Sequence, residues 1–167
     1  MEFRRHVSRA LHQDHAASLA ILARLETLLG RHGAGRPPDA QSADTTRFLK
    51  DLVRAVDVEI GPHFAFEEEA VFPFLAANGD QEMGEYLIEE HRTILPLAER
   101  LVELAKLARE AGFTAEAWAE FHEIGASLVE RFVSHIQKED MGLLPALDEA
   151  LDEETDGKLA IEFAARR

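Results

Sequence analysis

The chain has no cysteine, few basic residues and no long hydrophobic run. Without thiols there is no disulfide, no thiolate zinc site and no iron–sulfur cluster, so any metal must be bound by His and carboxylate groups. The 18 Lys and Arg residues stand against 32 Asp and Glu residues, which gives a formal net charge of −14. Such a chain repels the phosphates of nucleic acid, because that binding depends on Lys and Arg. We therefore expect no nucleic-acid partner.

Membrane and export signals are also missing from the sequence. No segment approaches the roughly 18 consecutive apolar residues of a membrane span. The basic stretch Met1–Leu11 is not followed by an apolar core of signal-peptide length. We expect a cytoplasmic protein without a membrane partner. The hydrolase motifs G-x-S-x-G and H-E-x-x-H and the phosphate-binding loop do not occur either, so classical acyl or phosphoryl transfer has no support.

The apolar residues recur every three or four positions, which is the period of an amphipathic helix, and no alternating stretch predicts a strand. A loop rich in Gly and Pro separates the first two helices. The first predicted helix contains the apolar stripe from Leu11 to Leu29. The next three cover about 46–77, 81–111 and 114–140, and a shorter C-terminal helix or tail starts near Pro145. These lengths predict an all-α, antiparallel, up-down-up-down four-helix bundle. We assign residues 1–150 to the bundle and 151–167 to a C-terminal helix or tail, which either belongs to the same domain or is flexible.

Prolines interrupt two of the predicted helices. Pro62 follows Gly61 in the second helix, and Pro96 lies in the third. Proline removes a backbone hydrogen bond and typically kinks a helix. Because Pro62 directly precedes His63, its kink is either simply tolerated or used to direct that side chain.

The sequence contains an internal repeat. From His63 it reads HFAFEEEAVFPFL, and from His135 it reads HIQKEDMGLLPAL, both of which fit H-x3-E-[ED]-x4-P-x-L. A weaker pair precedes each copy: LHQDHAASL from Leu11 and LIEEHRTIL from Leu87 fit L-x2-[DE]-H-x3-L. The chain therefore contains two copies of one helix-pair motif.

The spacing of the repeat predicts that its His and Glu residues converge. Residues four apart lie on the same face of a helix, about 5–6 Å apart at Cβ. In the preceding motif, the His replaces an apolar residue between two Leu residues of a core-facing stripe, so we expect it to point inward. The predicted ligand set is His15, His63, Glu67, His91, His135 and Glu139.

A bundle core that contains these groups requires a cation, because a buried carboxylate without a partner is expensive. Imidazole and carboxylate ligands suit iron, manganese or zinc. If each Glu bridges two ions, the side chains fill about eight of the roughly twelve positions of two six-coordinate ions, and a bridging oxygen fills two more. Roughly two positions then remain for a small ligand such as O2, peroxide or NO.

From about His12 to Leu147, the chain resembles the hemerythrin-like, or HHE cation-binding, domain. The resemblance implies a four-helix bundle around two non-haem iron ions with an oxo or hydroxo bridge. The four His residues of the predicted set would be terminal ligands, and Glu67 and Glu139 would be bridges. Oxygen-carrying hemerythrins have a fifth His one turn from the third-helix His, where this chain has Leu87 and Leu95. The resemblance is therefore closer to relatives linked to NO, peroxide or iron stress.

Two alternatives remain open within the predicted ligand set. His12 lies three residues before His15 on the same helix and is its rival, although the repeat aligns His15 with His91. Asp140, five residues after His135, could replace Glu139 as the bridge. We favour Glu139, because on an ideal helix residue i+4 stays within about 40° of residue i whereas i+5 swings to about 140°.

Other polar residues near the motifs are expected to be solvated or structural. We predict solvent-facing positions for Glu68 and Glu69. Asp14 and Glu90 could accept a hydrogen bond from a ligating histidine if their helices turned them inward, but we favour a solvent-facing position for both. Tyr86 is expected to belong to the core or the surface, although a tyrosine near a di-iron site could also carry a radical or a proton. His122 is rotated away from His135 on the fourth helix, so we do not expect it to be a ligand.

The first functional hypothesis is a di-iron protein that binds or reduces a small oxidant, either in sensing or in a stress response. The alternative is a metal- or oxygen-responsive module that changes a partner interaction without turnover. The sequence does not decide whether the protein is an enzyme, and it names no protein partner. A ferritin-like iron oxidase is a weaker interpretation, because its E-x-x-H motif does not occur in the chain.

Overall fold

The structure, a computed structural model, describes residues 2–166, which form helices and no strands. The helices in chain order are α1 (His6–Arg31), α2 (Ala43–Arg54), α3 (Gly61–Phe66), α4 (Phe72–Ala77), α5 (Gln81–Ala111), α6 (Ala115–Lys138), α7 (Leu144–Ala150) and α8 (Glu153–Ala165). Three π-helical turns lie between them, η1 (Ala55–Ile60), η2 (Glu67–Val71) and η3 (Glu139–Leu143). None of the described helices combines the length and the apolar composition that crossing a bilayer requires.

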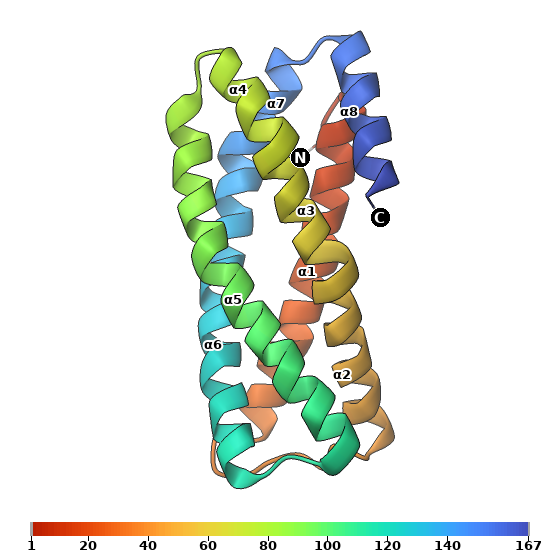
Figure 1. Cartoon of the computed structure of the whole chain (residues 1–167), viewed down its shortest axis with the longest axis vertical. Coiled ribbons are helices and arrows are strands. Elements are labelled where there is room, and N and C mark those ends of the chain that lie inside the picture. Colours follow the sequence, from red (N-terminus) through yellow and green to blue (C-terminus); the bar gives the residue numbers. More distant parts are fainter. Residues whose placement is uncertain (1, 167) are drawn as a thin grey trace.

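The helices form an antiparallel four-helix bundle (Figure 1). The second helix of the bundle is the continuous run from α2 to α4, and the fourth is the run from α6 to α7. α1 and α5 run down the bundle in Figure 1, and the other two run up. The prediction of an all-α, up-down-up-down bundle is therefore confirmed.

The end of the fourth bundle helix differs from the prediction. We expected this helix to stop near Asp140 and a C-terminal helix or tail to start near Pro145. Instead, η3 carries the helix past Pro145 to the end of α7, and the separate C-terminal helix is α8. Asp152 caps α8, since its side chain accepts a hydrogen bond from the backbone N–H of Thr155 at 2.7 Å.

All three π turns end two residues before a proline. The backbone N–H of Phe72, before Pro73, bonds to the carbonyl of Glu67 five residues back, and Leu144, before Pro145, bonds in the same way to Glu139. Proline has no N–H, and its ring crowds the carbonyl four residues back, so one widened turn lets the helix continue through it. The predicted kink at Pro62 takes this form in η1.

Two hydrophobic clusters fill the bundle, one at each end. The cluster at the α1–α2 connection includes residues 21–29 of α1 and 94–108 of α5. The other includes residues 3–11, Leu87 and the apolar side chains of α7 and α8. His15 and His91 lie between the two clusters in sequence, so the predicted ligands occupy a polar layer with apolar packing above and below.

The C-terminal helices hold the start of α1. The buried carboxylate of Asp148 accepts backbone N–H bonds from Arg4 and Arg5, and that of Asp156 accepts them from His6 and Val7, at 2.7–3.2 Å. These bonds satisfy N–H groups that a helix start leaves without partners. Burial raises the pKa of the Asp148 carboxyl, but the bonds outweigh it and hold the pKa below its ordinary value.

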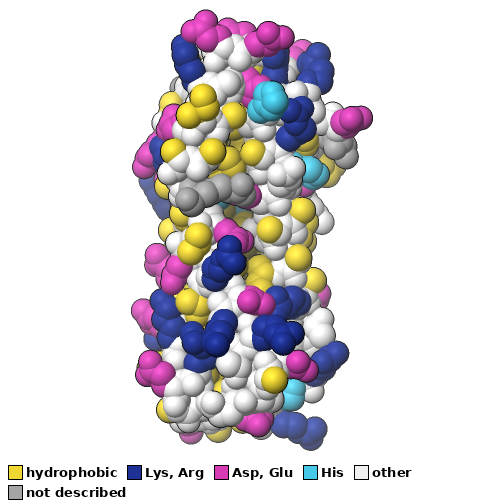
Figure 2. Space-filling view, turned by 90° about the vertical axis from the view of Figure 1, so that its right-hand side faces the viewer, with side chains coloured by type: hydrophobic (Ala, Val, Ile, Leu, Met, Phe, Trp, Pro, Cys, Tyr) yellow, Lys and Arg dark blue, Asp and Glu magenta, His cyan; other side chains and the backbone are white. Residues whose placement is uncertain are grey.

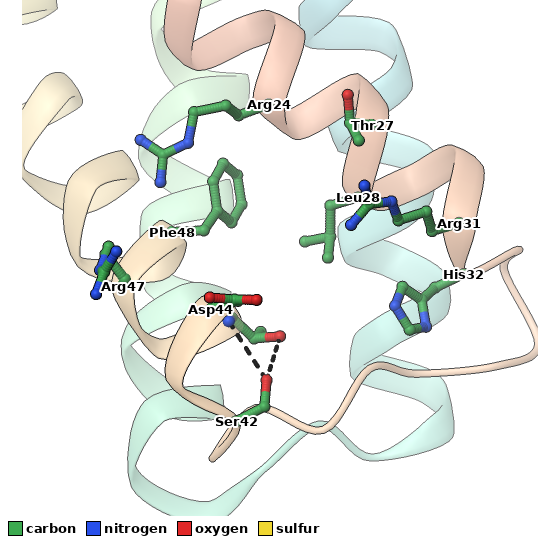
Figure 3. A pocket seen from close by; sticks show the side chains of 10 residues that line it. Arg24, Thr27, Leu28, Arg31, His32, Ser42, Asp44, Arg47 and Phe48 are labelled. Carbon is green, nitrogen blue, oxygen red and sulfur yellow. Dashed lines mark hydrogen bonds between the residues drawn. The ribbon is translucent and has the colours of Figure 1, made fainter.

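Basic side chains gather where α1 and α2 meet, on the lower half of the face in Figure 2. Residues 24–54 contain six Lys or Arg and four Asp or Glu, in contrast to the acidic remainder of the chain. A surface pocket between these helices is lined by Arg24, Arg31 and His32 beside Phe48 (Figure 3). None of the predicted metal ligands lines it, so this pocket is separate from the polar layer.

Candidate metal centre

The structure brings all six predicted ligands together inside the bundle. Three bundle helices supply His15, on α1, His91, on α5, and His135, on α6. The remaining three are His63 on α3 and the two Glu residues that begin η2 and η3. All six are buried, and the exposed fractions of both Glu residues are 0%.

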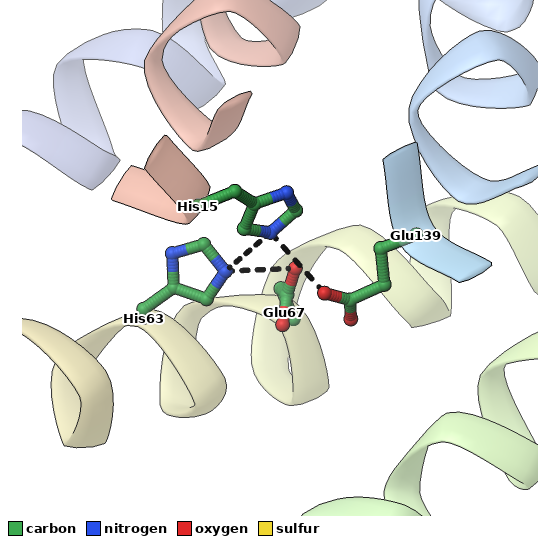
Figure 4. A group of neighbouring side chains, drawn as sticks. All are labelled: His15, His63, Glu67 and Glu139. Atoms are coloured by element: carbon green, nitrogen blue, oxygen red, sulfur yellow. Dashed lines mark hydrogen bonds and ion pairs between the residues drawn. The ribbon is translucent and has the colours of Figure 1, made fainter. Parts of the chain in front are cut away.

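The first group of donors contains His15 and His63 (Figure 4). Their Nε2 atoms lie 3.2 Å apart. The Nε2 of His63 is 3.2 Å from Oε1 of Glu67, and the Nε2 of His15 is 3.2 Å from Oε2 of Glu139. Four side chains from three bundle helices therefore offer donor atoms within 4.8 Å of one another.

The second group contains His91 and His135. Their Nε2 atoms lie 3.1 Å apart. The Nε2 of His135 is 3.0 Å from Oε1 of Glu139, and the Nε2 of His91 is 3.5 Å from Oε2 of Glu67. Each carboxylate thus gives one oxygen to each group, so the two groups share both Glu residues.

The four oxygens of Glu67 and Glu139 are buried without a hydrogen-bond partner. A charged oxygen removed from water without such a partner is strongly unfavourable, with an effective penalty of several kcal/mol for each ion. A cation beside each histidine pair would satisfy all four oxygens at once. The donor set of imidazole and carboxylate fits iron, manganese or zinc.

Each histidine of the cluster also contacts an acidic side chain through its outer nitrogen, Nδ1. These contacts join His15 to Asp140 at 2.7 Å, His63 to Asp14 at 3.5 Å, His91 to Glu68 at 2.9 Å and His135 to Glu90 at 3.0 Å. Such a carboxylate fixes the ring and leaves Nε2 as the atom that faces a metal. In every case the acid and the histidine come from different bundle helices.

These contacts overturn the prediction that Asp14 and Glu90 face solvent. Asp14 is buried, and the Glu90 side chain is only 21% exposed. A residue next to a core-facing histidine lies about 100° around the helix, where it meets either solvent or the neighbouring helix. Here the neighbouring helix presents an imidazole. Glu68 and Glu69 are both exposed as predicted, although Glu68 also contacts His91 and Glu69 pairs with Arg166.

The two open alternatives separate clearly in the structure. Glu139 lies between the two histidine pairs, whereas Asp140 lies outside them, with its side chain 24% exposed. His12 also lies outside, and its Nδ1 is 3.0 Å from Oδ1 of Asp140. His122 contacts the backbone carbonyl of Leu29 at 3.3 Å, away from both groups.

Tyr86 lies at the surface, and its hydroxyl donates a hydrogen bond to Glu90 at 3.3 Å. Glu90 in turn contacts Lys138 and the outer nitrogen of His135. The tyrosine is therefore linked to the second group through one carboxylate. The sequence motif alone did not reveal this link, because Tyr86 and His135 are on different helices.

The groups of the cluster shift one another's protonation. Burial lowers the pKa of His15, His63 and His135, but the neighbouring carboxylates outweigh it and raise all three above the ordinary value. Burial raises the pKa of Glu139, yet the imidazoles around it bring that pKa well below its usual range. The cluster therefore combines an ionised carboxylate with imidazoles that bind protons readily, and a metal must displace those protons.

Aromatic rings enclose the cluster. Phe64 stacks on His91 with ring centres 3.7 Å apart, and Phe72 contacts the same imidazole at 5.7 Å. Phe163 of α8 packs edge-on against His63 at 6.0 Å. Apolar side chains in these positions limit the access of water and hold the imidazoles in place.

Searches of curated proteins and of solved structures found no significant match. A family model described as the hemerythrin HHE cation-binding domain matches residues 6–154. This span includes both copies of the repeat and all six residues of the buried cluster. The chain therefore belongs to the hemerythrin HHE cation-binding domain family.

Proposed function

We propose that the protein binds two iron ions in the buried cluster and binds or reacts with a small oxidant, namely O2, NO or peroxide. One observation carries the proposal: two histidine pairs share both oxygens of two buried carboxylates that have no hydrogen-bond partner. The first ion would be held by His15 and His63 and the second by His91 and His135, with Glu67 and Glu139 bridging them. Manganese or zinc could substitute, since the same donors accept them.

A reactive centre is favoured over a purely structural one because the protein donors do not complete the coordination of two six-coordinate ions. When bound, a pair of iron ions supplies one-electron redox chemistry and open positions for a small ligand. Leu87, one turn before His91, packs in a hydrophobic cluster and offers no fifth histidine. This composition favours reaction with the oxidant over reversible oxygen carriage.

The chain's own residues have separate tasks in this proposal. The acidic partners on Nδ1 orient the imidazoles and keep Nε2 available. Phe64 and Phe163 exclude water from the two histidine pairs. The raised imidazole pKa values let the cluster hold protons until a metal arrives.

The test is elemental analysis of protein purified from iron-replete cells, together with its visible spectrum before and after NO. We expect about two iron ions per chain and a spectrum that NO changes. The double variant Glu67→Ala and Glu139→Ala should lose two-metal loading and remain helical without metal. Glu69→Ala is the matched control, because Glu69 is exposed and lies outside the cluster. Unchanged metal content in the double variant would refute the bridging role.

A further inference from the structure

A third group of possible metal ligands lies just outside the buried cluster. It contains His12, His15 and Asp140, each of which offers a donor atom within 4.8 Å of the other two. Oδ1 of Asp140 is 3.0 Å from Nδ1 of His12 and 2.7 Å from Nδ1 of His15. Two imidazoles and a carboxylate are suitable ligands for a divalent cation such as Fe²⁺, Zn²⁺ or Co²⁺.

Exposure decreases across this group from solvent towards the cluster. The side chain of His12 is 38% exposed and that of Asp140 is 24% exposed, whereas that of His15 is only 2% exposed. A cation arriving from solvent can therefore meet His12 and Asp140 without any rearrangement of the fold. His15 belongs to both groups, since its Nδ1 faces Asp140 and its Nε2 faces Glu139.

The orientation of His12 is fixed by packing. Its ring lies edge-on to Phe3, a buried residue, with ring centres 5.4 Å apart. His12 and His15 are three residues apart on α1, a spacing that places both on neighbouring turns of one helix face. The two imidazoles are thus held on the same side of Asp140 by the backbone and by the core.

The other acidic partners of the cluster form no such group. Glu90 is already paired with the cation of Lys138, which would repel a metal ion. Glu68 contacts the single imidazole of His91, and Asp14 is buried. Among the described residues, only Asp140 joins a second histidine into a set of three ligands outside the buried cluster.

The internal repeat supports the same distinction. His12 aligns with Ile88 in the second copy, while Asp140 aligns with Glu68. The second half therefore keeps the acidic partner and has an apolar side chain where the first half has an extra imidazole. His91, the equivalent of His15 in the second half, is oriented without a second imidazole beside its acidic partner. Orienting His15 therefore does not require His12.

We propose that His12, Asp140 and the outer nitrogen of His15 form a third, solvent-accessible cation site through which metal ions enter the buried cluster. The site itself depends only on these three side chains. Its role as an entry site rests on the proposed function, because the cluster is the destination of the ions. An ion held here is already in contact with one ligand of the first buried pair.

The first experiment follows the uptake of Co²⁺ by metal-free protein in a stopped-flow spectrometer, at Co²⁺ concentrations below one equivalent. The variant is His12→Ile, which copies the residue of the second half. We expect the uptake rate to fall about tenfold, the scale on which metal sites respond to the loss of a supporting group. The final Co²⁺ content should stay at the wild-type level. His6→Ile, an exposed histidine on the same helix, is the matched control.

Two outcomes would overturn the proposal. If His12→Ile takes up Co²⁺ at the wild-type rate, the group is not an entry site. If the variant, loaded with excess Co²⁺ and then dialysed, holds one ion where the wild-type protein holds two, His12 is a ligand of the buried pair instead.

A second experiment separates this inference from the proposed function. In a Glu67→Gln and Glu139→Gln variant, we expect a weak Co²⁺ site that disappears when His12→Ile is added. Wild-type protein that fails to hold two ions would contradict the proposed function, whereas a His12-dependent site in this variant would still support the outer site. Co²⁺ binding that does not change on the addition of His12→Ile would refute it.

Discussion

The two halves of the buried cluster have the same inner donors and different outer surroundings. Over the first half, Asp14 is buried and Phe163 of α8 packs against His63. Over the second half, Glu90 bonds to His135 and also contacts the surface residues Lys138 and Tyr86. Two bound ions would need the same inner donors, whereas the outer residues are free to differ. Two ions in this cluster would therefore be chemically distinct.

The largest expected effect comes from removing one histidine from each half in turn. His63→Ala should lose the first ion and His135→Ala the second, so that each variant retains about one ion per chain, because the remaining pair keeps its own donors and both carboxylates. Elemental analysis of the purified variants measures this. His122→Ala, which lies outside both groups, is the control. Loss of both ions from either single variant would show that the halves load only together.

A smaller effect is expected from the acidic partners on Nδ1. Glu68→Gln should weaken metal binding about 10- to 100-fold, because it removes the charge that orients His91 at 2.9 Å. Asp14→Asn should weaken it less, since its contact with His63 is longer, at 3.5 Å. Competition with a chelator gives both affinities, and Glu69→Gln serves as the exposed control. Equal losses in the two variants would mean that these distances do not control affinity.

Much of the fold and of the inner cluster could be predicted from the sequence, because both depend on helical periodicity. Apolar residues at intervals of three and four indicated the bundle helices. His63 and Glu67, four residues apart, had to lie on one face of a helix, and the second copy repeats this spacing. The family match over residues 6–154 confirms the resemblance that these motifs suggested.

The sequence left the outer contacts of Asp14 and Glu90 undecided, because they depend on which helices are neighbours and on which side. Asp14 and Glu90 lie beside core-facing histidines, and periodicity alone does not distinguish a position between helices from a solvated one. The continuation of the fourth bundle helix past Pro145 was also missed. Proline usually ends or kinks a helix, and the widened turn that accommodates it leaves no clear signal in the residue pattern.

The pH dependence of stability should distinguish metal-free from metal-loaded protein. The pKa values of His15, His63 and His135 lie above the ordinary 6.5 in the metal-free fold. Their protonated forms therefore stabilise that fold fully below pH 6.5, and this stabilisation is lost as the pH rises through the raised values. The pKa of Glu139 lies well below 4.5, so its contribution is present above pH 4.5 and is lost as the pH falls further.

Thermal unfolding from pH 5 to pH 9 measures this difference. Metal-free protein should become less stable as the pH rises above about 6.5, because these three histidines lose their protons. Metal-loaded protein should become more stable over the same interval, because metal ions compete with protons for the imidazoles. The metal affinity should rise by up to about tenfold per pH unit for each proton that the metal displaces. Parallel slopes for the two forms would show that metal binding does not displace protons from these groups.

The smallest expected effect concerns the packing of α4 against α5 in the second half. A Cβ added at Gly84 would lie 2.9 Å from Cβ of Phe72, so α4 or α5 must shift to accept it. Gly84→Ala should therefore destabilise the fold by about 1 kcal/mol net, because overpacking outweighs the gain in helix propensity. Gly157→Ala in α8 is the matched control, since nothing lies within 4 Å of its added Cβ, and it should be neutral or stabilising. Chemical denaturation measures both variants. Phe72 contacts His91, a histidine of the second pair. If Gly84→Ala also lowers the metal affinity of the second pair and leaves that of the first pair unchanged, the packing around Phe72 acts on the second half alone.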